Sequence, residues 1–293
     1  MRPDGTRRRR LTRYLGNGGS GFGWPTVALG RDRLSVVRSR NDDAALDVYS
    51  LRRNGSRQRR VYKSPRPSGP TDFATNAAIA PNASWIVYTR DEASMWRVKP
   101  SGHARRKILE YRVKGRRGST YDKYLIRDPN VSPNGGAIAF VHADTSASAP
   151  EEEGALALVD ATGKNTRLLT NQFYNSAHEQ PPTDKPLTSE VVAPRFSPDG
   201  TKIVFGCSIP PKLTASRLCV INVDGSGFHV VVPNAGRLSH GGTYNRSLPT
   251  AAWSPTGDRF VFSCGREMRH LCVVNADGSG RRTIGSGFSP TWG

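Results

Sequence analysis

The sequence lacks long apolar segments and contains little histidine. No run of about 18 apolar residues occurs, so no membrane-spanning helix is predicted. Arg7 to Arg10 are followed by the polar, glycine-rich segment RYLGNGGSGFG, so the first residues do not have the apolar centre of a signal peptide. Only 6 histidines occur among 293 residues, which limits the sites at which imidazole could bind a metal or move a proton.

Motifs of hydrolysis and of nucleic-acid recognition are also missing. There is no Gly-x-Ser-x-Gly elbow, which argues against a prolyl-peptidase arrangement. No zinc finger or RNA-recognition motif accompanies the arginines, and no aromatic residues alternate with them. The segments NVDGSG and NADGSG begin like a calcium loop but lack its later acidic ligands. We therefore expect no cofactor and no specific recognition of nucleic acid.

The residues that are abundant favour a turn-rich fold. The chain is 36% hydrophobic, which is enough for a full core, and it contains 30 glycines and 21 prolines. Glycine and proline are turn residues and interrupt long helices. An all-β fold is the first expectation.

One repeated feature is a strand that follows a tight turn. PRFSPDGTKIVFGC from Pro194 and TAAWSPTGDRFVFSC from Thr250 are the clearest copies. We align them on the anchors Pro198 and Pro255, and the anchors of the other copies are Leu29, Pro81 and Pro133. Apolar residues recur five and seven positions after each anchor, at Leu34 and Val36, Ile86 and Tyr88, Ile138 and Phe140, Ile203 and Phe205, and Phe260 and Phe262. This alternation predicts a strand with one buried face.

A second repeated feature is a turn glycine followed, six residues later, by an apolar residue. The pairs are Gly5 and Leu11, Gly55 and Val61, Gly102 and Ile108, Gly163 and Leu169, Gly225 and Val231, and Gly278 and Ile284. Asp, Asn, Ser or Thr precedes each glycine, as expected for a turn between antiparallel strands in which the glycine has a positive φ.

Together the two features predict a unit of four antiparallel strands, which we name a, b, c and d in chain order. Repetition of such a unit at roughly 50 to 60 residues is typical of β-propeller blades. The segments FSPDGTKIVF, WSPTGDRFVF, CVINVDGSG and CVVNADGSG resemble the repeats of TolB-like six-bladed propellers, whereas the Trp-Asp dipeptide of WD-repeat propellers is absent. The resemblance implies an extracytoplasmic interaction module.

We predict one six-bladed propeller domain over residues 1–293. Five blades are expected at 21–65, 73–112, 125–171, 190–234 and 248–285. Residues 1–20 would supply the outer strand, and residues 286–293 the inner strand, of a closing blade that lacks strands b and c. We therefore expect the natural protein to extend upstream through these two strands and into a signal peptide. The alternative is a five-bladed ring with overlapping ends.

The four cysteines occupy equivalent positions in two blades. Cys207 and Cys264 lie nine residues after their proline anchors, and Cys219 and Cys272 lie six residues before their turn glycines. Each pair flanks a b–c hairpin, so the paired strands bring the two sulfur atoms within reach of a disulfide. We predict the disulfides Cys207–Cys219 and Cys264–Cys272, and hence a periplasmic or secreted protein. Buried free thiols or a zinc site are the alternatives.

The chain is strongly basic, with 43 Lys and Arg against 24 Asp and Glu and a net charge of +19. Basic clusters at 7–10, 57–60, 105–107 and 281–282 fall between the turn glycine and the apolar residue of strand d, the outermost strand. Charges on exposed edge strands block aggregation, so we interpret these clusters first as edge protection. Weak, salt-sensitive binding of polyanions is the second interpretation.

The candidate binding site lies on the face that carries the long b–c and d–a loops. Loops on a rigid scaffold are where binding groups gather. The candidate residues there, which could stack, hydrogen-bond or carry charge, are Tyr174, His178, Glu179, His240, Tyr244 and Arg246. The alternative for each of them is an ordinary solvated loop residue.

We expect a non-catalytic, monomeric scaffold that binds a protein or an envelope polymer. One alternative is a propeller-type lyase or hydrolase acting on acidic polysaccharide, with His178 and His240 on a metal and Glu179 as third ligand or base. The other alternative is a basic protein that binds polyanions.

Overall fold

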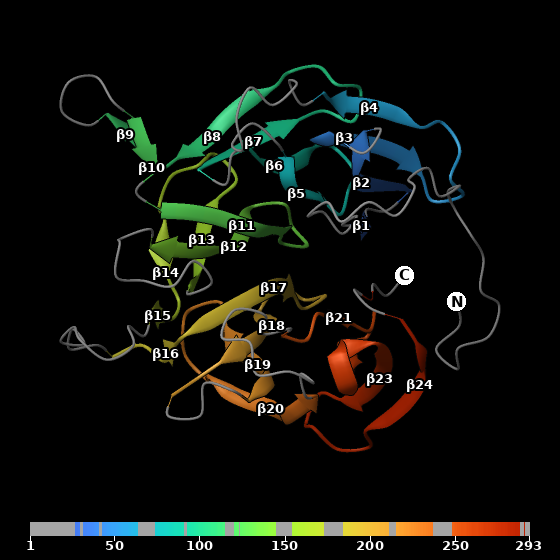
Figure 1. Ribbon diagram of the computed structural model, residues 1–293, viewed down its shortest axis with the longest axis vertical. Coiled ribbons are helices and arrows are strands. Elements are labelled where there is room, and N and C mark those ends of the chain that lie inside the picture. The colour runs from blue at the N-terminus through green and yellow to red at the C-terminus, as the bar shows by residue number, and fades with distance from the viewer. Residues whose placement is uncertain are drawn as a thin grey trace.

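The computed structural model describes residues 27–29, 32–40, 43–63, 74–90, 93–114, 120–122, 124–144, 154–172, 184–210, 215–236, 248–287 and 290. Within these ranges the elements are β-strands, apart from one 3-10 turn, η2, at Arg266–Met268. Five four-stranded antiparallel sheets surround a common centre (Figure 1). This arrangement is a β-propeller, and each sheet is one blade. The described residues contain no helix long and apolar enough to cross a membrane.

Each blade has its strands in the chain order a, b, c, d. Blade 1 contains β1 (Val27–Leu29), β2 (Arg33–Arg40), β3 (Asp43–Arg52) and β4 (Arg59–Tyr62), and blade 2 contains β5 (Ala74–Ile79), β6 (Ile86–Arg90), β7 (Ser94–Val98) and β8 (Arg106–Glu110). Blade 3 contains β11 (Tyr124–Val131), β12 (Ala137–Asp144), β13 (Ala155–Asp160) and β14 (Arg167–Leu168). Blade 4 contains β17 (Glu190–Phe196), β18 (Lys202–Ser208), β19 (Ser216–Asn222) and β20 (His229–Gly236). Blade 5 contains β21 (Ala251–Trp253), β22 (Arg259–Cys264), β23 (His270–Asn275) and β24 (Arg282–Ser286).

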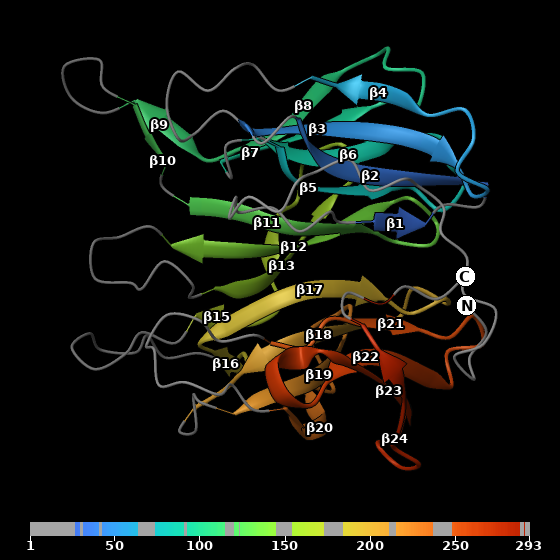
Figure 2. The same cartoon turned by 45° about the vertical axis from the view of Figure 1, so that its right-hand side comes forward.

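Two smaller strand pairs lie outside the blades. A hairpin joins β9 (Arg112–Lys114) to β10 (Thr120–Asp122), and a parallel pair joins β15 (Asn171–Gln172) to β16 (Leu187–Thr188). Strand a of each blade lies toward the centre of the ring and strand d toward its outside (Figure 1). In Figure 2, β11, β12 and β13 of blade 3 lie directly above blade 4, and β11 contacts β17 of blade 4.

Strand b buries both of its faces, whereas the sequence predicted one buried face. Phe205 and its neighbour Val204 are both 0% exposed, and so are Phe140 and Ala139. The prediction was wrong because a blade is stacked between two others, so side chains on both faces of its sheet leave water. Apolar clusters accordingly fill the interfaces between blades 1 and 2, 2 and 3, 3 and 4, and 4 and 5.

The two residues of the glycine repeat meet between blades. In blades 2 to 5 the c–d turn glycine lies against the preceding blade, at the residue six positions after that blade's own glycine. The contacts join Gly102 to Val61, Gly163 to Ile108, Gly225 to Leu169, and Gly278 to Val231. The six-residue spacing between the turn glycine and the apolar residue therefore recurs because both residues contact a neighbouring blade.

Five blades are described where the sequence predicted six. Residues 1–20, assigned to the closing blade, lie outside the described residues. Of the segment 286–293, Ser286 ends β24 in the outer strand of blade 5 and so does not belong to an inner strand. Within the described residues, no apolar cluster spans blades 5 and 1, although Ala252, Val261 and Val273 form a buried cluster within blade 5.

Two disulfides join strands b and c in blades 4 and 5. They link Cys207 to Cys219 and Cys264 to Cys272, the predicted pairs, with Cα–Cα distances of 6.0 Å in both. Each bond crosses the hairpin diagonally, because Cys219 pairs in register with Phe205 rather than with Cys207. All four side chains are buried and face the preceding blade. The Cys207–Cys219 bond therefore lies at the interface of blades 3 and 4, and the Cys264–Cys272 bond lies at the interface of blades 4 and 5. Both bonds fit an oxidising compartment.

Candidate functional site

The six residues predicted as a binding site occupy positions 174–179 and 240–246, which lie outside the described residues. The loop-face site therefore stays a prediction. Within the described ranges, no group of three or more His, Cys, Asp and Glu side chains is arranged to hold a metal ion.

The described residues instead form a groove between blades 4 and 5, with a volume of about 440 Å³. It lies on the face made by the a–b and c–d turns, which we call the turn face. Val220 and Trp253 line its bottom, since both are buried, and Asp199, Lys202 and His229 line its edge, since all three are exposed. The candidate site thus opens on the face opposite to the one that the long loops suggested.

The a–b turn of blade 4 forms one edge of the groove and is closed by its own side chains. Ser197 Oγ donates a hydrogen bond to Asp199 Oδ1 at 2.5 Å, and the Thr201 amide donates to the same oxygen at 3.0 Å. The Lys202 amide donates to Ser197 Oγ at 2.9 Å. Because the serine hydroxyl both donates and accepts within the turn, it is held as a structural group rather than as a nucleophile.

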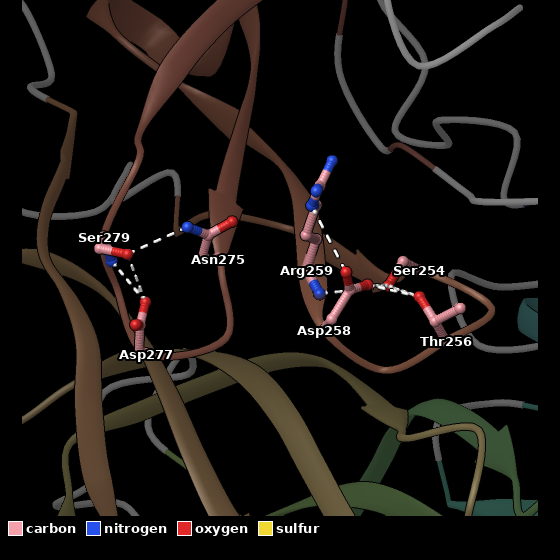
Figure 3. Close-up of polar contacts among 7 residues, drawn as sticks. All are labelled: Ser254, Thr256, Asp258, Arg259, Asn275, Asp277 and Ser279. Atoms are coloured by element: carbon pink, nitrogen blue, oxygen red, sulfur yellow. Dashed lines mark hydrogen bonds and ion pairs between the residues drawn. The ribbon is translucent and has the colours of Figure 1, made fainter.

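The a–b turn of blade 5 forms the opposite edge with a related network (Figure 3). Ser254 Oγ donates to Asp258 Oδ1 at 2.7 Å, and the Arg259 amide donates to Ser254 Oγ at 3.1 Å. The hydroxyl of Thr256 also contacts Asp258 Oδ1. The groove therefore lies between two turns whose shapes are set by their own hydrogen bonds.

The c–d turns of blades 4 and 5 are also closed by their own side chains, each around one aspartate. In blade 5, Asp277 Oδ1 accepts hydrogen bonds from the Ser279 amide at 2.9 Å and the Ser279 hydroxyl at 2.7 Å, and Asn275 Nδ2 donates to that hydroxyl at 3.0 Å (Figure 3). Asp224 of blade 4 has the equivalent bonds to Ser226.

These bonds lower the pKa of the turn aspartates, because a hydrogen bond to a carboxylate favours its charged form. The Ser197 hydroxyl lowers the pKa of Asp199 most, and the Thr256 hydroxyl that of Asp258. Both groups are therefore carboxylates at neutral pH. Asp199 thus presents a charged carboxylate at the edge of the groove.

The remaining groups of the groove offer an indole, an imidazole and an ammonium. Trp253 is held in place because its Nε1 donates to the Arg195 carbonyl at 3.1 Å. His229 Nδ1 lies 2.8 Å from the Gly227 carbonyl, which leaves Nε2 to a ligand. Lys202 has no carboxylate partner among the described residues. An apolar bottom with both charge signs at its edge suits the binding of a polar, extended chain.

Several basic residues contact the neighbouring blade, which the sequence interpretation as edge protection did not include. Arg281 donates to the carbonyls of Asn234 at 2.6 Å and Ala235 at 3.2 Å, on the outer strand of blade 4. Its guanidinium also lies 5.4 Å from the centre of the Phe262 ring. The aromatic partners come from other strands, so the sequence around the arginine could not reveal them.

Sequence reasoning missed the groove because its two edges lie more than fifty residues apart. The signal that could have found it is the pair of Ser-Pro turns beginning at Ser197 and Ser254, once the two blades are known to be neighbours.

No family model matches the chain, and no curated protein matches its sequence. Solved structures match its fold. A protein assigned as TolB from Agrobacterium tumefaciens is 14% identical with a TM-score of 0.58, and the match covers 92% of this chain and 85% of that one. An oligogalacturonate lyase in complex with manganese is 14% identical, with a TM-score of 0.54 and coverage of 88% of this chain and 64% of the lyase. Puromycin hydrolase is 18% identical, with a TM-score of 0.56 and coverage of 89% and 39%.

The class of protein is thus a β-propeller with TolB and related propellers among its structural neighbours. At these identities the likeness establishes the fold alone. The chain spans less than two thirds of the lyase and of the hydrolase, so their activities do not transfer to it.

Proposed function

We propose that this protein is a non-catalytic scaffold of an extracytoplasmic, oxidising compartment, and that it holds a protein or an envelope polymer in the groove between blades 4 and 5. The observation that carries the proposal is the construction of this groove. Its turns are closed by internal hydrogen bonds, and the two blades that form it are the two that carry disulfides.

Rigidity of this kind favours binding because it reduces the entropy lost when a partner docks. The groove is lined by a buried aromatic ring, Trp253, by the ammonium of Lys202 and by the carboxylate of Asp199. An aromatic group at the bottom and charges at the edge are the composition of a protein-binding surface.

We also propose that residues 1–20 close the ring as the outer strand of a sixth blade. In blades 2 to 5 the c–d turn glycine lies on the apolar residue of the preceding blade. The same register would place Gly5 on Ile284 of blade 5, and Gly55 of blade 1 on Leu11. The sequence carries both residues at the required six-residue spacing.

Site-specific photo-cross-linking in the native host tests the groove. A benzophenone amino acid at Thr256 lies on the groove edge, whereas the same group at Thr166 lies on a blade 3 turn, outside the groove. We expect a discrete cross-linked species from position 256 that is weakened by Lys202→Glu. Equal cross-linking from position 166, or none from position 256, would contradict the proposal.

A lyase is the competing function, and the fold shared with a manganese-bound oligogalacturonate lyase is the observation that favours it. Incubation with oligogalacturonate, with and without manganese, distinguishes the two. Formation of unsaturated sugar products, lost in a His178→Ala and His240→Ala double variant, would replace the scaffold proposal with an enzymatic one.

A further inference from the structure

The outer surface of blades 1 and 2 carries a dense group of cations. We name this surface the cationic rim and define it by Arg57, Arg59, Arg60, Arg105, Arg106 and Lys107. All six are exposed, and they come from the c–d turns and outer strands of two consecutive blades.

Edge protection does not account for this distribution. Strand β20, the outer strand of blade 4, is eight residues long and has the sequence HVVVPNAG, which contains no Lys or Arg. Cations are thus not the general protection of the outer edges, since β20 carries Pro233, which also blocks pairing. The concentration of positive charge on blades 1 and 2 therefore needs a second explanation.

The rim is continuous from one blade to the next. The Arg105 guanidinium of blade 2 lies 5.5 Å from the centre of the Tyr62 ring on β4 of blade 1. Tyr62 in turn stacks on Tyr88 of blade 2, with 4.8 Å between ring centres. The cations of β4 and β8 thus form one surface across the interface.

Aromatic rings also hold the cations in place. Lys107 Nζ lies 5.9 Å from the centre of the Trp96 ring, and Trp96 Nε1 donates to Ser94 Oγ at 3.0 Å. A cation that is already positioned loses less rotamer entropy when an anion binds. The rim is therefore organised before any ligand arrives.

The nearby acids neutralise only part of this charge. Asp47 pairs with Arg60 at 3.3 Å, and Glu110 pairs with Lys107 at 2.5 Å. Among the described residues, no ion pair joins a carboxylate to Arg57, Arg59, Arg105 or Arg106. Four exposed guanidinium groups on one surface are left to an external polyanion.

We propose that the cationic rim binds an acidic polysaccharide. This site is separate from the groove and goes beyond the proposed scaffold function. A polysaccharide fits better than a nucleic acid for two reasons. The Tyr62 and Trp96 rings are occupied by cations and so offer no free platform for stacked bases, and the disulfides fit a compartment where polysaccharide is the common polyanion.

The test uses the whole chain with a heparin decasaccharide as the probe and a single-stranded DNA as the comparison. The rim variant R59E/R106E reverses two exposed arginines. The matched control R266E/R282E reverses two exposed arginines of blade 5, so both variants change the net charge equally. Circular dichroism checks that both remain folded.

We expect R59E/R106E to weaken heparin binding by about tenfold or more and to reduce the salt slope by about two, because two ion pairs are lost. The control should change the affinity less than about twofold. The neutral variant R59Q/R106Q, which adds no repulsion, should give a smaller loss in the same direction. Equal weakening by rim and control variants, or no heparin binding by the wild type, overturns the proposal. DNA binding that is as tight and as sensitive to R59E/R106E assigns the rim to nucleic acid instead.

Discussion

Two equivalent glycines provide a sharp test of how the blades pack. Gly163 and Gly225 occupy the same c–d turn position, with φ of +89° and +96°. An alanine at either site would adopt a backbone conformation that costs about 1–2 kcal/mol for a residue with a Cβ. Their surroundings differ. A Cβ at Gly163 would lie 1.6 Å from the Ile108 carbonyl oxygen, whereas one at Gly225 would approach only Leu169 Cδ2, at 3.9 Å.

Gly163→Ala should therefore add an overpacking cost of about 1–3 kcal/mol to the conformational cost that Gly225→Ala has alone. For a chain of this size about 1 kcal/mol corresponds to about 2 °C in Tm. We therefore expect Gly163→Ala to lower Tm by about 4–10 °C and Gly225→Ala to lower it by about 2–4 °C. Gly278→Ala should fall between them, since its Cβ would lie 2.7 Å from the Val231 carbonyl oxygen.

Thermal unfolding at pH 7, followed by circular dichroism, measures these differences. Wild type and the three variants should be compared at one protein concentration and one heating rate. The reasoning is refuted if Gly163→Ala and Gly225→Ala lose the same stability, or if Gly225→Ala loses more. Either result would mean that the c–d turns do not pack on the preceding blade as described.

Three further predictions follow from the disulfides, the turn aspartates and the closing blade. Replacing Cys264 and Cys272 by serine removes a disulfide with a sequence separation of 8 and should lower the free energy of unfolding by about 2.5 kcal/mol, as measured by urea titration. An unchanged free energy of unfolding would show that this disulfide does not stabilise the fold. The hydroxyl of Thr162 lowers the pKa of Asp160 from 3.8 to about 2. The Asp160 carboxylate therefore stabilises the fold above about pH 4, and this contribution is lost as the pH falls toward 2. Asp160→Asn should make the decline of Tm between about pH 4 and pH 2 less steep, and it should leave Tm above about pH 4 unchanged. Leu11→Asp should lower Tm as Leu169→Asp does if residues 1–20 close the ring, and a silent Leu11→Asp would remove that proposal.

The strand order within each blade could be predicted from the sequence because it depends on short-range patterns. The alternation at Phe260 and Phe262 marks strand b, and Gly278 marks the turn before strand d; both signals lie within one blade. The disulfide pairs could be predicted for the same reason, since Cys264 and Cys272 flank a single hairpin. Local hydrogen bonding and alternation determine these features without knowledge of the neighbouring blades.

Features that depend on how blades stack could not be read from the sequence. Strand b buries Val204 as well as Phe205 because a second blade covers the other face of the sheet. Arg105 contacts an aromatic ring, Tyr62, that lies more than forty residues away in the chain. The groove likewise combines Lys202 of blade 4 with Trp253 of blade 5.

The sequence by itself therefore determined the blade, its turns, its disulfides and the sign of its charge, because these follow from residue type and local spacing. Only the tertiary structure decided which face carries a groove and which arginines bind a neighbouring blade or remain free. The physical reason is that contacts between blades join residues far apart in the chain, and residue type and local spacing do not show which of these residues meet.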